Sequence, residues 1–124
     1  MNIYLAGPMR GYKDFNFPLF FKVGTKLKEA GHEVFNPAER DTKEWGSQNL
    51  KTATGNEFEV ASALGMDPLA MARHCFLADT HYICTRADAI YLLPGWEASK
   101  GATAERALGA AIGLKIVELT NEDL

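Results

Sequence analysis

The segment at residues 87–93 (ADAIYLL) constrains the fold of this chain more than any other. Its apolar residues are nearly continuous instead of alternating with polar ones, which is typical of a strand buried on both faces of a parallel sheet. Parallel strands need long crossover connections, which usually contain a helix. The segment therefore predicts an α/β fold in which strands alternate with helices.

Three further short segments are apolar and rich in strand-forming residues. They lie at residues 2–6 (NIYLA), 32–35 (HEVF) and 115–119 (KIVEL). Helical patterns separate them, at about residues 17–30, 68–86 and 102–114. We therefore predict a Rossmann-like, flavodoxin-like domain, with a parallel sheet of about four to five strands and helices on both faces.

Residues with capping chemistry mark where two of these helices begin. Asn16 is a candidate side-chain cap for the first helix, which ends at Gly31. Asp67 followed by Pro68 is a strong start for the second, because proline is favoured at the first helical position. The apolar positions that we expect on the buried face of this second helix are Leu69, Ala72, Cys75 or Phe76, Tyr82 and Ile83.

Residues 38–66 show no clear periodicity and few apolar residues. We interpret them as a surface insertion with one helical turn near residues 57–64. A loop of this length is usually functional or mobile, so it is a candidate substrate lid or subunit contact. An excursion without a function is equally compatible with the pattern.

Composition excludes several classes of protein. The chain has 124 residues, a net charge of −3 and two cysteines, which indicates one domain, at residues 1–124, with both thiols reduced. No run of about 20 apolar residues and no secretory signal is present, so we expect a cytoplasmic protein. The chain has no concentrated basic stripe for duplex nucleic acid and no ligand pattern for a metal.

Two glycine-bearing loops follow predicted strands at the edge where open α/β sheets bind ligands. The first holds Gly7, Pro8, Met9, Arg10 and Gly11, and the second spans residues 94–101. Neither matches the dinucleotide fingerprint or the Walker loop. Arg10 is a candidate ligand for a phosphate or carboxylate, although a lone loop arginine is also often only solvated.

Glu105 follows Ser99 and Gly101 at the start of the third helix. Free N–H groups and the helix dipole favour an anion there, and we expect the same field to keep Glu105 ionised in the first turn. An ionised glutamate can serve as a nucleophile at an anomeric carbon. An acidic residue that only stabilises the helix start gives the same pattern.

Asp79 lies among apolar neighbours on the second helix, where burial would raise its pKa and suit it to protonate a leaving base. A solvated helical aspartate fits the spacing equally well. Tyr4 lies inside the first strand and is by default a core residue. Asp88, at the head of its strand, is interpreted as a strand-entry or capping residue.

Together these motifs resemble the nucleoside 2-deoxyribosyltransferase superfamily. The resemblance rests on YLAGPMRG at residues 4–11, on Asp79 with ADAI at 87–90, and on Ser99-x-Gly101-x-x-x-Glu105 before an Ala/Gly-rich helix. It is nearest to the 2'-deoxynucleoside 5'-monophosphate N-hydrolases and to related small phage and prophage proteins. Residues 38–66 have no counterpart in it, and Pro8 replaces a residue that usually carries a hydroxyl.

The resemblance implies a role for each matched position. Glu105 would be the nucleophile on C1', Asp79 would assist departure of the base, and Tyr4 would orient the nucleophile or contact the sugar. The residues from Gly7 to Gly11 would shape the pocket. Ser99 stands where transferases of free nucleosides carry an aspartate, which favours a 5'-monophosphate, because a hydroxyl beside helix N–H groups binds phosphate.

The resemblance further implies catalysis without a metal or organic cofactor, and a homodimer or higher oligomer that completes each site. We therefore expect an enzyme that cleaves the N-glycosidic bond of a deoxynucleoside monophosphate, by hydrolysis or base transfer. An inactive nucleotide-binding or sensing module of the same fold is the main alternative. A protein that uses residues 38–66 to bind a macromolecular partner is the other.

Overall fold

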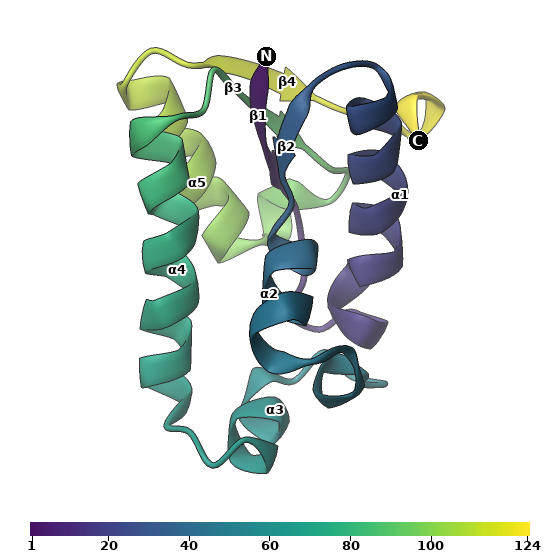
Figure 1. Ribbon diagram of the computed structural model, residues 1–124, viewed down its shortest axis with the longest axis vertical. Coiled ribbons are helices and arrows are strands. Elements are labelled where there is room, and N and C mark those ends of the chain that lie inside the picture. The colour runs from purple at the N-terminus through teal and green to yellow at the C-terminus, as the bar shows by residue number, and fades with distance from the viewer.

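The computed structural model describes residues 1–124 and contains one sheet of four parallel strands. The strand order is β2-β1-β3-β4, with β1 at Asn2–Ala6, β2 at Glu33–Phe35, β3 at Ala89–Leu92 and β4 at Lys115–Glu118. One face packs against α1 (Phe17–Glu29), and the other packs against α4 (Pro68–Thr85) and α5 (Lys100–Ala111) (Figure 1). The predicted α/β, Rossmann-like class is confirmed. No helix has both the length and the apolar composition needed to span a membrane.

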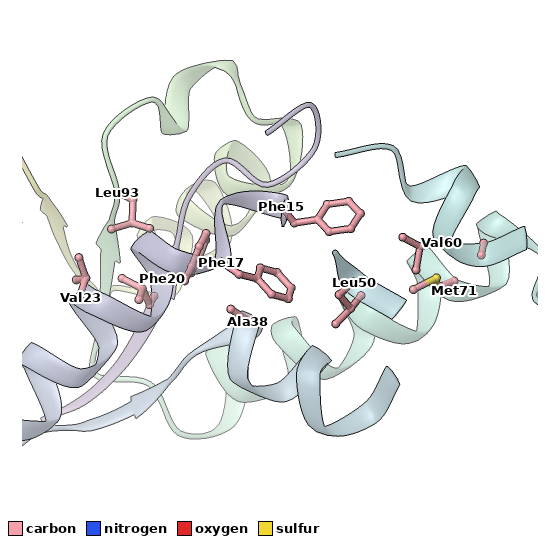
Figure 2. Packing of buried hydrophobic residues seen from close by; sticks show 11 residues of the cluster. Phe15, Phe17, Phe20, Val23, Ala38, Leu50, Val60, Met71 and Leu93 are labelled. Atoms are coloured by element: carbon pink, nitrogen blue, oxygen red, sulfur yellow. The ribbon is translucent and has the colours of Figure 1, made fainter. Parts of the chain in front are cut away.

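Side chains of β1 alternate between the two faces, as the period of a strand requires. Leu5 belongs to a buried cluster with Phe20 and Val23 of α1, which Figure 2 shows from close by. Tyr4 instead packs with Tyr82 of α4 and Ile90 of β3. Tyr4 therefore faces α4 and α5, the helices that carry Asp79 and Glu105.

Two of the three principal helices begin with a side-chain cap. Asp67 accepts a hydrogen bond from the N–H of Ala70 at 3.0 Å, and Ser99 accepts one from the N–H of Ala102 at 3.1 Å. The predicted cap at Asn16 is wrong. Asn16 adopts a left-handed conformation with φ of 62°, and its amide donates to the carbonyl of Pro8 at 3.1 Å, tying the helix start to the first glycine loop.

The buried face of α4 differs from the prediction in the N-terminal half of the helix. Tyr82 and Ile83 are buried as expected, but Leu69 and Phe76 are 56% and 41% exposed, and Met71 is buried in their place. The reason is positional, because this half of α4 extends beyond the edge of the sheet (Figure 1). Its contacts are with α3 instead.

Residues 38–66 are more ordered than predicted. The helical turn near residues 57–64 is confirmed as α3 (Glu57–Ala63), but the sequence pattern missed α2 (Pro37–Trp45). The interpretation of the segment as a surface excursion is wrong as well. Four of its residues enter the cluster beneath α1, namely Ala38, Leu50, Val60 and Ala61. The segment therefore completes the core on that side of the molecule.

We predict that Gly109→Ala destabilises the protein, although alanine favours helices by up to about 1 kcal/mol. A Cβ at Gly109 would collide with Cδ1 of Ile90, which is fully buried in β3. Overpacking of this kind costs about 1–3 kcal/mol. Urea denaturation measures the effect, and Gly101→Ala in the same helix is the matched control, because no atom lies within 4 Å of its added Cβ. Equal stability of the two variants would contradict the prediction.

Candidate active site

A cavity of about 840 Å³ opens at the carboxyl ends of β1 and β3. These strands are neighbours at the point where the chain reverses its direction across the sheet, which is where open α/β sheets bind ligands. The loop after β1, the loop before α5 and one side of α4 all contribute to the lining. Tyr4, Asp79 and Glu105 line it together, so the three predicted catalytic residues come from three different elements.

Tyr4 and Glu105 form a buried hydrogen bond. The hydroxyl of Tyr4 donates to Oε2 of Glu105 at 2.5 Å, and the two residues are 0% and 6% exposed. The ring of Tyr4 stacks on Phe35 with centroids 5.4 Å apart, which fixes the position of the hydroxyl. Tyr4 is thus a core residue that also holds a carboxyl group in a defined orientation.

The environment of Glu105 raises its pKa to about 8, chiefly through burial and then through the charge of Asp79. Our expectation that the helix start keeps Glu105 ionised in the first turn is therefore wrong. The helix begins at Lys100, so Glu105 lies in the second turn, and the field of a helix end falls off within the first. The hydrogen bond from Tyr4 acts in the opposite direction and lowers the pKa.

Asp79 has the environment that its apolar neighbours predicted. Burial raises its pKa to about 7, with a further contribution from the charge of Asp41. Its Oδ1 is buried without a hydrogen-bond partner, and an orphaned oxygen is costly for a charged carboxylate. Two such groups share one charge at neutral pH. The hydrogen bond from Tyr4 lowers the pKa of both carboxyls. Because Glu105 has the higher pKa of the two, the shared proton lies mainly on Glu105 and the charge on Asp79.

Asp41 is a third carboxyl in the cavity, and the sequence analysis missed it. It lies on α2, where Nη1 of the neighbouring Arg40 donates to its Oδ1 at 2.8 Å. Burial raises the pKa of Asp41 to about 6, and the charge of Arg40 opposes this rise. The signal that could have found it is Asn36 before Pro37, the same cap-and-proline start that Asp67 and Pro68 give α4.

The N-terminus of α5 forms the polar end of the cavity. Ser99, Lys100 and Gly101 line it, and no atom other than the local chain lies within 4 Å of a Cβ placed on Gly101. The hydroxyl oxygen of Ser99 accepts the N–H of Ala102, which leaves its own O–H free to donate. This end can bind an anionic group through N–H donors and a positive helix end.

The loop after β1 contributes Gly7, Pro8, Met9 and Arg10 to the lining, but not Gly11. Gly11 instead has φ of 81° and donates its N–H to the carbonyl of Gly55 at 3.0 Å. Arg10 is held by Glu57 of α3 at 2.7 Å. Gly11 therefore shapes the loop and attaches it to residues 38–66, while its neighbours reach the cavity.

Asp88 has a structural role, because its Oδ2 accepts the N–H of Asn2 at 2.8 Å where β1 and β3 begin. No three His, Cys, Asp or Glu side chains are arranged to hold a metal ion. The chemical groups of the cavity are therefore carboxyls, hydroxyls, backbone N–H groups and the basic side chains at its rim.

Comparison with known proteins gives one family. A family model described as a domain of unknown function, DUF4406, matches residues 1–118. The chain belongs to the DUF4406 family. The match includes all four strands and every residue that lines the cavity, so the site lies inside the DUF4406 domain. No curated protein matches the chain, and no solved structure matches it.

Proposed function

We propose that this DUF4406 protein cleaves the N-glycosidic bond of a 2'-deoxynucleoside 5'-monophosphate, as the resemblance to nucleoside 2-deoxyribosyltransferases implies. The observation that carries the proposal is the buried hydrogen bond between Tyr4 and Glu105 beside the orphaned carboxyl of Asp79. When two neighbouring carboxyls hold one proton between them, the ionised one can act as a nucleophile and the protonated one as an acid. Cleavage at an acetal-like carbon such as C1' needs both roles. No step requires a cofactor.

The reacting form of the site carries the shared proton on Asp79. In the first step, a carboxylate oxygen of Glu105 attacks C1' and forms a covalent bond to it. The C1'–N bond breaks, its electron pair stays on the base, and protonated Asp79 donates its proton to that base. Tyr4 keeps Glu105 oriented, and its O–H stabilises the ionised form. The products of this step are a free base and a glycosyl ester of Glu105.

The second step releases the sugar. Water attacks C1' and gives a proton to Asp79, while the bond between C1' and Glu105 breaks and Glu105 leaves as a carboxylate. A second base in place of water completes a base transfer. Both outcomes restore the starting protonation of the two carboxyls.

The polar end of the cavity fits the 5'-phosphate. The proposed ligands are the Ser99 hydroxyl and the first N–H groups of α5, with Lys100 at the rim. Glu105 lies one and a half turns further along the same helix, about 9 Å from Ser99 by helix geometry. Because helical side chains point back toward the N-terminus, the carboxyl of Glu105 is closer to the phosphate site than its backbone is, and one nucleotide can reach both.

Chromatography of a panel of deoxynucleotides and deoxynucleosides tests the proposal. We expect release of free base from at least one monophosphate, with water or an added base as acceptor. Base release from no substrate would overturn it, as would full activity in Glu105→Ala.

We predict that Ser99→Asp reduces kcat/KM for the monophosphate by roughly 10- to 100-fold, as loss of charge-assisted hydrogen bonds does. The new carboxylate would still cap α5, so the helix is retained, but it repels the phosphate. Its effect on the unphosphorylated nucleoside should be small or favourable. Kinetics on the matched pair of substrates measure the change, and an equal loss on both would contradict a phosphate site here.

A nucleotide-binding or sensing module without turnover is the second candidate. The raised pKa of Glu105 favours it, because a neutral glutamic acid is a poor nucleophile. Calorimetry separates the two candidates, since this alternative requires tight nucleotide binding without product. It also requires that Ser99 matter for binding and that Glu105 be dispensable.

We also propose that a second copy of the chain covers the cavity. Leu69 and Phe76 are seven residues apart on α4, so they share one face of the helix. Both line the cavity and are nevertheless 56% and 41% exposed. Contiguous exposed apolar side chains mark contact surfaces. Sedimentation of the wild type and of Leu69→Asp tests this, and a monomeric wild type would overturn it.

A further inference from the structure

The carboxyl of Asp41 lines the cavity where α2 contributes to it, and, in addition to burial, its charge raises the pKa of Asp79 in the same lining. Burial raises the pKa of the Cys75 thiol, the charge of Asp41 raises it further, and Arg40 lowers it. Cys75 and Asp79 are one turn apart on α4 and both line the cavity, a separation of about 6 Å along the helix. A base whose glycosidic nitrogen receives the proton of Asp79 would therefore extend toward Asp41.

The lining that Asp41 shares is largely apolar and partly aromatic. The rings of Phe15 and Phe17 point toward Leu50, Val60 and Met71 (Figure 2), and all five side chains line the cavity. Aromatic and apolar walls of this kind accept the flat face of a base. In such surroundings a polar group at the edge of the base decides which base is accepted.

Arg40 fixes the carboxyl of Asp41 without occupying it. The guanidinium is absent from the cavity lining and donates to Oδ1 alone, whereas a carboxylate has about four lone-pair positions. With a pKa of about 6 the group is ionised at neutral pH. Asp41 therefore presents acceptors and no donor.

We propose that Asp41 determines base specificity, by accepting hydrogen bonds from adjacent N–H donors on the edge of the base. This inference rests on the proposed function. Guanine presents such an edge, with a ring N–H beside an amino group. Adenine places a ring nitrogen acceptor beside its amino group, so its lone pair would face the carboxylate.

Asp41→Asn is designed to reverse this preference. Arg40 has only donors, so it orients the new amide with the oxygen toward itself and the NH₂ toward the cavity. That amide donates to the ring nitrogen of adenine and accepts from its amino group, but it opposes the ring N–H of guanine. A bidentate base contact discriminates between bases by a factor of at least about 5. The variant loses one such contact with guanine and gains one with adenine, so we expect the guanine-to-adenine ratio of kcat/KM to fall at least about 30-fold.

The experiment measures kcat/KM for the 5'-monophosphates of deoxyguanosine, deoxyinosine and deoxyadenosine. Wild type should prefer deoxyguanosine, and deoxyinosine, which lacks the amino group, should lose roughly 10-fold or more. The deoxyinosine comparison needs no variant and so decides the question if Asp41→Asn does not fold. Glu44→Gln is the matched control, because Glu44 lies on the same helix and contacts His74 at the surface.

Base release with an unchanged ratio in Asp41→Asn, or with no penalty for deoxyinosine, would overturn this inference and leave the proposed function standing. If no substrate releases base, the proposed function fails separately. Calorimetry with the same three nucleotides then decides the inference. It survives only if wild type binds the guanine nucleotide more tightly and Asp41→Asn reverses the order.

Discussion

Glu105→Gln is expected to lower base release from a deoxynucleoside monophosphate by at least about 10³-fold, the scale of losing a catalytic nucleophile. Glutamine has nearly the same shape as glutamate and can still accept the hydrogen bond from Tyr4, which is 2.5 Å long in the wild type. It cannot form the bond to C1'. The loss should therefore fall on kcat, with KM little changed, because substrate contacts remain.

The measurement is quenched-flow chromatography together with the mass of the intact protein after an acid quench. Wild type should carry a deoxyribose phosphate adduct during turnover, and Glu105→Gln should carry none. Glu29→Gln is the control, since Glu29 lies at the exposed end of α1. An adduct on the Glu105→Gln variant, or a loss below about 10-fold, would show that Glu105 is not the nucleophile.

Tyr4→Phe tests whether the Tyr4 hydroxyl adjusts the pKa of Glu105 or whether Tyr4 only packs in the core. The variant keeps the ring stacked on Phe35 and removes only the hydroxyl, which lowers the pKa of Glu105 in the wild type. The pKa of Glu105 should rise further, so the pH at which activity appears should move upward. A merely structural Tyr4 would reduce activity without moving the pH profile.

Much of the site was predictable because its residues belong to elements that carry strong local signals. The strand at residues 2–6 places Tyr4 on one face by period two, and the Asp67-Pro68 start sets the register of α4 and so the direction of Asp79. Ser99 caps α5 and thereby directs Glu105 toward Tyr4. Each of these inferences needed only local sequence.

Asp41 was not predictable in the same way, because its helix is polar along most of its length and only Pro37 and Ala38, in its first turn, are buried. The start of α2 is nevertheless explicit. Oδ1 of Asn36 accepts the N–H of Ala38 at 3.0 Å, while its amide donates to the carbonyl of Phe20 at 3.0 Å. The second bond fixes α2 against α1, and no local pattern reports such a tertiary contact.

The charge state of the site also depends on tertiary structure. The sequence places Glu105 near a helix start, which favours ionisation, but burial against Asp79 dominates and raises its pKa to about 8. A local field cannot predict that result, because the second carboxyl comes from a different helix. The burial of Glu105 beside Asp79 also explains why these two carboxyls can exchange one proton near neutral pH.

The two carboxyls should make the protein less stable as the pH rises from about 5 to 9. Their pKa values in the folded state, about 8 for Glu105 and about 7 for Asp79, lie above those of an unfolded chain. The folded state therefore binds more protons between about pH 4 and 8, and its stability falls with pH in that interval. We expect a loss on the order of 2–4 kcal/mol, levelling off above the folded pKa values.

Glu105→Gln should remove about half of this loss, because it deletes one of the two buried carboxyls, whereas burial and the charge of Asp41 still raise the pKa of Asp79. Urea denaturation at pH 5 and pH 9 measures the difference between variant and wild type. Near pH 5 the two should have similar stability, and at pH 9 the variant should be the more stable, with Tm higher by roughly 5 °C or more. Glu29→Gln makes the same change of charge at an exposed site, so its stability should depend on pH in the same way as that of the wild type. If the stability of Glu105→Gln changed with pH as that of the wild type does, the two carboxyls would not be buried as they are in the structure.

This test needs no substrate, so it examines the electrostatics of the site independently of its chemistry. If these buried carboxyls are retained for function at a cost in stability, Glu105→Gln should be more stable than the wild type and inactive.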